Sequence, residues 1–220
     1  MRLFKLLILI LVLNVILYSQ ENKDEGKQIH RVSFLSSGNV IELSVQNISE
    51  LSLSGIKINV SDAPSWINFK FKEKIIEAIE SNSETASEFT FSVDKTAIVN
   101  KEQSISFTIS TLAGEVWTKQ VKIVVTPPER FELYQNYPNP FNPLTIVNYK
   151  LPIDNWVMLK VYDVLGREVA TLVDEFKEAG YHEVAIDGTN YSSGIYFYQM
   201  TVNDQSGKTT IARKRMIMMK

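Results

Sequence analysis

The chain contains no cysteine and only two histidines among its 220 residues. Without cysteine no disulfide can form, so the fold must be held together by the burial of apolar side chains. A chain without cysteine and without a pair of histidines is a poor candidate for a zinc site, and we predict neither a metal nor any other cofactor. The formal net charge of −2 favours neither nucleic acid nor an anionic membrane as a partner.

The sequence also lacks the common catalytic motifs. No G-x-S-x-G, no Walker phosphate-binding loop and no H-E-x-x-H occurs in it. His30 and His182 are far apart in the sequence and are expected to be strand or surface residues. Aspartates at predicted turns are expected to cap backbone N–H groups, with a calcium site as the alternative. These aspartates are Asp154, Asp163, Asp174 and Asp187. Because the common catalytic motifs are missing, we expect a protein that is not an enzyme.

A long apolar run is confined to the first twenty residues, "MRLFKLLILILVLNVILYSQ". Arg2 and Lys5 precede the apolar run, and Ser19 and Gln20 follow it, before the charged "ENKDEG". This order is typical of a cleaved secretory signal peptide, residues 1–20, followed by a polar mature N-terminus, residues 21–28. The alternative is an uncleaved anchor, but an apolar span of about 17 residues is near the short limit for crossing a bilayer. We expect no permanent transmembrane span.

Apolar and polar residues alternate from residue 29 to residue 126. This period of two predicts strands with one face on a core, here an immunoglobulin-like antiparallel β-sandwich of about seven strands. One segment departs from the alternation: "KEKIIEAIES", residues 72–81, fits either a short crossover helix or an edge strand. The alternating segments are "VIELSV", "GIKINV", "EFTFSV", "ISFTIS" and "KQVKIVV".

Two prolines in "TPPER" end this series, and residues 127–130 are predicted to be a linker. A second series of alternating segments follows, and it predicts another β-sandwich over residues 131–220. In its fifth strand Tyr196, Tyr198, Met200 and Val202 are expected to face the core. Strands are predicted at residues 145–151, 157–164, 168–173, 181–186, 195–202 and 209–219, with glycines of positive φ at the corners: Gly166, Gly180, Gly188, Gly194 and Gly207.

Residues 134–143, "YQNYPNPFNP", form what we call the lead-in to the second series. Each of its three prolines fixes φ near −65° and has no N–H for a sheet ladder. The residue before each proline is also kept out of the helical region. The lead-in is therefore predicted to be extended and stiff, either to fix how the sandwich starts or to guard an edge strand against aggregation.

Several blocks of the second half occur in a recognisable order. The lead-in is followed by "VYDVLGREVATLVD", then by "AGYHEV", "SGIYFY" and a terminal strand rich in lysine and methionine. Together, over residues 131–220, they resemble the type A C-terminal sorting domain of the type IX secretion system of Bacteroidota and related phyla. The fold is also similar to that of the immunoglobulin-like domain of flagellar hook-capping proteins; the signal peptide and the C-terminal placement of the blocks favour the secretion family. The residues that match the motif are Pro138, Asn139, Pro140, Phe141, Asn142, Pro143, Gly166, Arg167, Gly180, Gly194, Tyr196, Lys214, Met216 and Lys220.

The resemblance implies export. A family member crosses the inner membrane by its signal peptide and folds in the periplasm, and its C-terminal sandwich is then recognised by the outer-membrane translocon. A sortase-like signal peptidase usually removes the sandwich, and the cargo is attached to surface lipopolysaccharide or released. The chain is thus expected to be secreted or on the outer cell surface. Cleavage is expected at Thr126, Pro127, Pro128, Glu129 and Arg130.

The first series resembles the bacterial immunoglobulin-like accessory domains found beside glycoside hydrolases. Asn47, Trp66 and Val93 are the positions that correspond to recurring residues of those domains. Such domains usually act as spacers. The alternative is a glycan- or partner-binding module in which Trp66 and Trp117 form a stacking platform, provided that both are exposed on one sheet face.

The final residues, "KTTIARKRMIMMK", contain five cations and no acid. A nucleic-acid patch is not favoured, because aromatic residues are not interleaved and export is expected. We expect either an edge strand kept soluble by its cations or a surface for the translocon. The cations are Lys208, Arg213, Lys214, Arg215 and Lys220.

Overall fold

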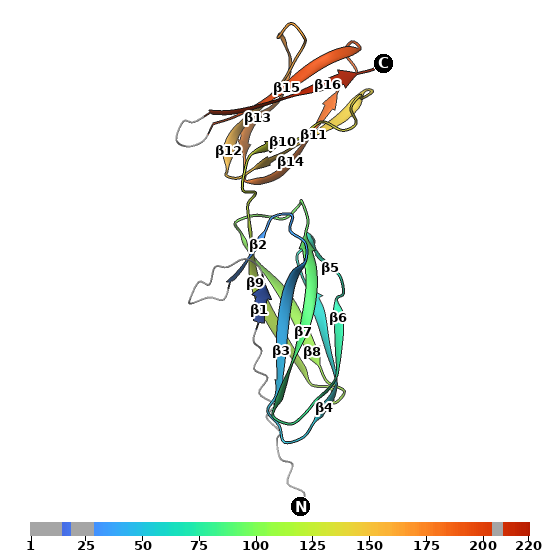
Figure 1. The fold of residues 1–220 in the computed structure, drawn as a ribbon, viewed down its shortest axis with the longest axis vertical. Coiled ribbons are helices and arrows are strands. Elements are labelled where there is room, and N and C mark those ends of the chain that lie inside the picture. Colours follow the sequence, from blue (N-terminus) through green and yellow to red (C-terminus); the bar gives the residue numbers. More distant parts are fainter. Residues whose placement is uncertain (1–14, 19–28, 204–208) are drawn as a thin grey trace, which may run out of the picture. The chain divides into compact units, whose positions relative to one another are not determined.

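The computed structural model describes residues 15–18, 29–203 and 209–220, the first of these ranges by its backbone alone. The described residues form strands joined by loops, with no helix among them, which confirms the predicted all-β class (Figure 1). Accordingly, this part of the chain has no helix that could cross a bilayer. The chain divides into two compact units, Met1–Thr126 and Pro127–Lys220.

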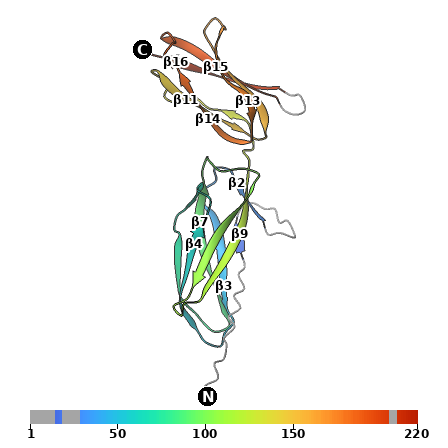
Figure 2. The ribbon, with the colours of Figure 1, turned by 180° about the vertical axis from the view of Figure 1, so that it is seen from behind.

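The first unit consists of two sheets, with strand orders β1-β3-β7-β5 and β2-β9-β8-β4-β6 (Figures 1 and 2). Neighbouring strands are antiparallel except β2, which runs parallel to β9. The strands are β1 (Val15–Tyr18), β2 (Ile29–Ser33), β3 (Asn39–Asn47), β4 (Leu53–Asp62), β5 (Ile67–Phe69), β6 (Glu73–Ile79), β7 (Ser83–Val93), β8 (Glu102–Ser110) and β9 (Val116–Thr126).

The predicted signal peptide, residues 1–20, lies outside the described residues except for β1, which pairs with Val40–Leu43 of β3. The predicted polar segment 21–28 lies wholly outside them. Removal of the signal peptide therefore stays a prediction.

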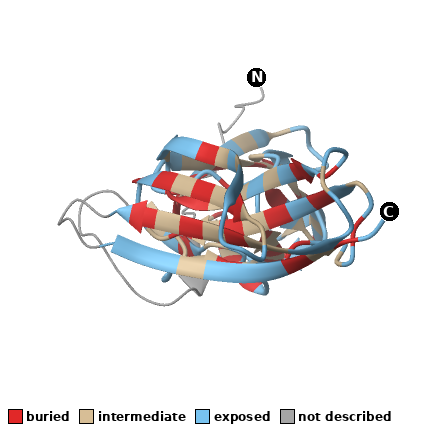
Figure 3. Ribbon diagram, turned by 90° about the horizontal axis from the view of Figure 1, so that it is seen from above, coloured by how far each residue is buried: buried red, intermediate tan, exposed pale blue. Residues whose placement is uncertain are grey.

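Alternate residues of the central strands face the core of the first unit, as their period of two predicted. An alternation of buried and more exposed residues along strands can also be followed in Figure 3, where the structure is seen from the end that carries the C-terminus. Ile41, Leu43 and Val45 of β3 are buried, and so are Phe89 of β7 and Phe107 of β8. The rings of the two phenylalanines meet edge to face with centroids 5.1 Å apart. Each such side chain contributes about 2 kcal/mol by burial, so the core needs no disulfide.

The segment that fitted either a helix or an edge strand is the edge strand β6. It pairs antiparallel with β4, where Ile76 lies opposite Ile56 and Ile79 opposite Leu53. Ile76 and Ile79 are buried against the core, whereas Ile75 stays 64% exposed. Pairing with β4 gives the backbone of β6 hydrogen-bond partners along one side, and this outweighs the local helical spacing of the isoleucines.

The carboxamide of Asn47 is fully buried at the end of β3. Its Nδ2 donates to the carbonyls of Leu51 and Ile79 at 2.8 and 3.1 Å, and its Oδ1 accepts the N–H of Ser49 at 3.0 Å. One side chain thus satisfies backbone groups of the loop that follows β3 and of the end of β6.

We predict that Asn47→Ala lowers the free energy of unfolding by about 3 kcal/mol, because buried carbonyl and N–H groups lose their partner. Urea unfolding of the full chain, followed by tryptophan fluorescence, measures the change. Asn68→Ala, at an exposed position of β5, is the control and should cost less than about 0.5 kcal/mol. Equal effects of the two substitutions would contradict the role given to Asn47.

The second unit also consists of two sheets, with strand orders β10-β11-β14 and β13-β12-β15-β16, all antiparallel. Each of the six segments predicted from the alternation corresponds to a strand, although β12 ends two residues and β16 one residue before the predicted end, and the short β10 is added. They are β10 (Glu132–Leu133), β11 (Leu144–Leu151), β12 (Asn155–Tyr162), β13 (Glu168–Lys177), β14 (Gly180–Asp187), β15 (Gly194–Asn203) and β16 (Thr209–Met218).

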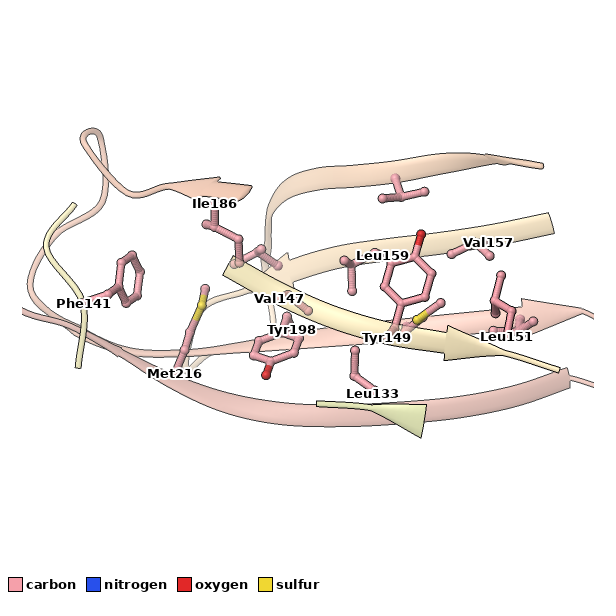
Figure 4. Close-up of a cluster of buried hydrophobic side chains, with 14 of the residues drawn as sticks. Leu133, Phe141, Val147, Tyr149, Leu151, Val157, Leu159, Ile186, Tyr198 and Met216 are labelled. Atoms are coloured by element: carbon pink, nitrogen blue, oxygen red, sulfur yellow. The ribbon is translucent and has the colours of Figure 1, made fainter. Parts of the chain in front are cut away.

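The core of the second unit lies between these two sheets (Figure 4). Tyr198, Met200 and Val202 of β15 are buried, which confirms the predicted core face, and Tyr196 is half-buried at its margin. The buried cluster comprises Leu133, Phe141, Val147, Tyr149, Leu151, Val157, Leu159, Val161, Val173, Ile186, Tyr198, Met200, Val202, Met216 and Met218.

Candidate functional site

The lead-in connects β10 to β11 and contains cis peptide bonds before Pro138 and Pro140. Its first half is held by the beginning of β11. Tyr137 donates its N–H to the carbonyl of Ile146 at 2.9 Å and accepts the N–H of Ile146 at 3.0 Å. The side chain of Tyr137 is 80% exposed, so this residue is held by its backbone alone.

The second half of the lead-in is held by the C-terminal strand β16. The N–H of Phe141 donates to the carbonyl of Ile217 at 3.0 Å, and the N–H of Met219 donates to the carbonyl of Phe141 at 3.0 Å. Asn139 adds a side-chain partner, since its Oδ1 accepts the N–H of Ile217 at 2.9 Å and its Nδ2 reaches the carbonyl of Arg215 at 3.5 Å. Residues 78 positions apart are thus joined at the edge of β16.

Asn136, which is 1% exposed, connects the lead-in to the core. Its N–H donates to the hydroxyl of Tyr198 at 2.8 Å, and that hydroxyl donates to the carbonyl of Tyr134 at 2.7 Å. Its Nδ2 donates to the carbonyl of Pro138 and to Oγ1 of Thr145, both at 3.0 Å. Burial raises the pKa of Tyr198 to about 12, so the hydroxyl keeps its proton at neutral pH.

Phe141 is the apolar anchor of the lead-in and is 2% exposed (Figure 4). The backbone of Gly188 approaches it so closely that a Cβ there would lie 2.9 Å from the phenylalanine ring and 3.1 Å from Sδ of Met218. The N–H of Gly188 donates to the carbonyl of Pro143 at 2.8 Å. Gly188 was predicted to supply a positive φ, which is wrong: this position requires glycine because of the close contact.

The predicted positive φ is confirmed at Gly166, Gly180 and Gly194, whereas Gly207 lies outside the described residues. Gly166 closes the turn between β12 and β13, where Nε of Arg167 lies 2.7 Å from Oδ2 of Asp163. These motif residues shape strand ends and have no hydrogen bond to the lead-in within the described part of the chain.

The remaining motif residues lie on or beside β16 and β15. Met216 is fully buried, whereas Lys214 is exposed. The N–H of Lys220 donates to Oγ of Ser193 at 3.0 Å, and the hydroxyl of Tyr196 donates to the carbonyl of Ser192 at 3.0 Å. The motif therefore contains residues of two kinds, those that fix the fold and those that stay on the surface.

The glycan-stacking platform does not form in the first unit. Trp66 is 4% exposed, because its ring fills the core beside β5, and Trp117 is half-buried. Trp66 therefore offers no face to a sugar ring.

At the predicted processing region, Thr126 ends β9, and Glu129 and Arg130 are exposed. Nη2 of Arg130 lies 2.7 Å from a carboxylate oxygen of Glu132.

Sequence reasoning missed the residues that hold the lead-in in place. Asn136 and Thr145 are buried polar groups at its two ends, and Gly188 lies beside its phenylalanine. An asparagine within a proline-rich segment does not reveal whether it is exposed in a turn or buried. The partner of its N–H, Tyr198, comes from β15, 62 positions later in the chain, so no local pattern could have shown this contact.

Tyr149 and Tyr198 form a matched pair, since both are fully buried and their hydroxyls point in opposite directions (Figure 4). The hydroxyl of Tyr198 has two hydrogen-bond partners, whereas that of Tyr149 has none among the described residues. We predict that Tyr198→Phe lowers the free energy of unfolding by about 2 kcal/mol, whereas Tyr149→Phe changes it by less than about 0.5 kcal/mol. Urea unfolding of both variants measures this, and a larger loss for Tyr149→Phe would contradict the assignment.

Asn139 and Asn142 provide a second matched pair within the lead-in. Asn142 is exposed, and its side chain makes no hydrogen bond within the part of the chain that the structure describes. We predict that Asn139→Ala speeds hydrogen exchange of the Ile217 amide by about fivefold, corresponding to a lost hydrogen bond of about 1 kcal/mol. Asn142→Ala should leave this exchange rate unchanged. Amide exchange monitored by NMR decides, and equal rates in the two variants would refute the role of Asn139.

Comparisons with solved structures give only distant similarities. The chain is 14% identical to dimeric latent PorU from Porphyromonas gingivalis, with a TM-score of 0.35. The match covers 93% of this chain and 20% of the PorU chain. It is 9% identical to BcpA, the major pilin subunit of Bacillus cereus, with a TM-score of 0.39. This match covers 96% of this chain and 67% of the BcpA chain. The chain thus spans about a fifth of the length of PorU. With TM-scores below 0.5, these likenesses carry no functional inference.

No curated protein matches the sequence. One family model does match it, over residues 135–217, and that family is described as the secretion system C-terminal sorting domain. The match covers the lead-in from Gln135 onward and continues through β16 as far as Ile217. Residues 135–217 of this chain are therefore a secretion system C-terminal sorting domain, the family that the sequence motifs indicated.

Proposed function

We propose that residues 131–220 direct export by the type IX secretion system, and that the signal read by this system is a folded surface. The match of residues 135–217 to the sorting-domain family carries the proposal. The contacts between the lead-in and β16 support the proposal of a folded signal. The lead-in and β16 are joined only in the folded chain, where Asn139 and Phe141 bind the backbone of Ile217.

The first unit is the cargo in this proposal. It acts as a non-enzymatic module, in agreement with a sequence that contains no catalytic motif. The sortase-like peptidase of the system would cut between the two units, within residues 126–131. The exposure of Glu129 and Arg130 supports this site, because a protease binds an extended and accessible backbone. The cargo is then released or attached to surface lipopolysaccharide.

Deletion of Met216–Lys220 tests the export step. The shortened chain loses Ile217 and Met219, which bind the lead-in, and the buried Met216 and Met218. We predict that it accumulates in the periplasm of a host with a type IX system, as measured by immunoblots of periplasm, cell surface and medium. The control is Leu51→Ser, at a position of the first unit that is 68% exposed, and it should be exported normally. Arrival of the shortened chain outside the cell would refute the proposal.

Mass spectrometry of the exported form tests the processing step. We predict that the cargo found outside the cell ends between Thr126 and Phe131 and lacks the second unit. The same measurement on the periplasmic form of the Met216–Lys220 deletion should show an uncut linker, because cleavage follows recognition. An exported chain that still ends at Lys220 would show that the second unit is not removed.

A further inference from the structure

The outer edge of β16 is paired along only part of its length. β16 is the last strand of its sheet and has β15 as its ladder partner. At the C-terminal end, backbone groups of Arg215, Ile217 and Met219 are bound by the lead-in. Residues alternate along an antiparallel strand between bonding one neighbour and bonding the other. By this alternation Ile211 and Arg213 also direct their N–H and C=O groups to the outer edge. β10 lies near β16, but no described residue forms a backbone hydrogen bond with Ile211 or Arg213 at this edge.

Three consecutive cations, Arg213, Lys214 and Arg215, lie where the unbonded part of this edge meets the part bound by the lead-in, and all three are exposed. Within the described part of the chain none of the three makes an ion pair. Two guanidinium nitrogens of Arg213 donate to Oε1 of Gln199, so this side chain is held in place by a neutral partner and keeps its charge uncompensated. Charge and an outward backbone without a hydrogen bond among the described residues therefore coincide at Arg213, with two further cations directly after it in the sequence.

The side chains of Arg213 and Arg215 lie on the outer face of their sheet, opposite Gln199 and Phe197 of β15. A concavity of about 430 Å³ opens on this face and is lined by Tyr162, Phe197 and Arg213, among others. Lys214 alternates to the other side of the strand. A strand added beside β16 would therefore place every second side chain next to Arg213 and Arg215, on the face where Arg213 lines the concavity.

We propose that the outer edge of β16 from Ile211 to Arg215 binds an extended acidic segment of a protein of the export machinery, which adds to the sheet as a further strand. The proposal rests on the proposed export function and names the surface that it uses. Main-chain hydrogen bonds would come from Ile211 and Arg213, as in β-strand addition generally. Selectivity would come from acids at alternate positions, one next to Arg213 and the next beside Arg215.

The same cations also explain why copies of this chain would not pair through this edge. Two β16 edges side by side would bring six unpaired cations together, and like charges across a strand pair are destabilising. Edge protection and partner selection thus have the same physical cause. Only an experiment that separates charge from backbone can distinguish a binding edge from one that is merely guarded.

Two variants of the full chain make this separation. Arg213→Gln, Lys214→Gln and Arg215→Gln together remove the charge and leave the backbone unchanged. Ile211→Pro removes one outward N–H and keeps all three cations; proline is tolerated at edge positions of this kind, and thermal unfolding checks the fold. The matched control replaces three cations of the first unit, Lys70, Lys72 and Lys74, with glutamine.

The probe is a fluorescein-labelled peptide, Thr-Glu-Val-Glu-Val-Glu-Thr, and fluorescence anisotropy measures its binding. We expect the triple-glutamine variant and Ile211→Pro each to bind it about tenfold more weakly than the natural sequence, and the lysine control to bind it equally well. A peptide of the same composition with its three acids adjacent should bind more weakly, because its acids do not match the alternation of the cations.

Three results would overturn the inference: no binding of the alternating peptide, equal binding by Ile211→Pro, or equal binding of the two peptides. Purified lipopolysaccharide serves as a second probe, and if it binds in a charge-dependent way while the peptide does not, the edge is a polysaccharide site. The triple-glutamine variant and the Met216–Lys220 deletion form are also expressed in the same host with a type IX system. If the triple-glutamine variant is exported while the deletion form stays in the periplasm, the inference is refuted and the proposed function remains intact. Failure of the natural sequence itself to be exported would refute the proposed function.

Discussion

The second unit depends on the pairing of the lead-in with the end of β16. Prolines exclude the lead-in from both sheets, so its remaining N–H and C=O groups must find partners elsewhere. They find them in the backbone of Ile146 through Tyr137, and in the backbone of Ile217 and Met219 through Phe141, with the side chain of Asn139 as a further partner of Ile217. This pairing places the ring of Phe141 in the core, closes one half of the edge of β16 and leaves the other half open.

The sequence predicted the strands well, because alternation is a local signal with a direct structural cause. The face of β15 that carries Tyr198 and Met200 followed from the same pattern. Short strands escaped prediction, since three residues in β5 and two in β10 are too few to show a period of two. β6 could not be decided from its isoleucines, because its conformation is set by pairing with β4.

The candidate site was predictable in part. The prolines and Phe141 were identified from the sequence, as was the stiffness of the lead-in. Its attachment could not be foreseen, because Asn136 and Asn139 bond groups about 60 to 80 positions away, which only the folded chain brings near. The role of Gly188 was mistaken for the same reason, since its close neighbour Phe141 lies 47 positions earlier in the numbering. The motif residues also divide physically, with Met216 required for the core and Lys214 left free on the surface.

The central claim is that the folded second unit is itself sufficient as an export signal. The most direct test fuses residues 127–220 to an unrelated reporter enzyme that carries its own signal peptide, in a host with a type IX system, and measures reporter activity in the medium and on intact cells. The account predicts that the reporter arrives outside the cell. It also predicts that the reporter stays in the periplasm when Phe141 is replaced by Asp, because a carboxylate cannot occupy the apolar position of the phenylalanine ring and the lead-in is then no longer anchored in the core. A reporter that stays in the periplasm with the unaltered unit attached would contradict the account.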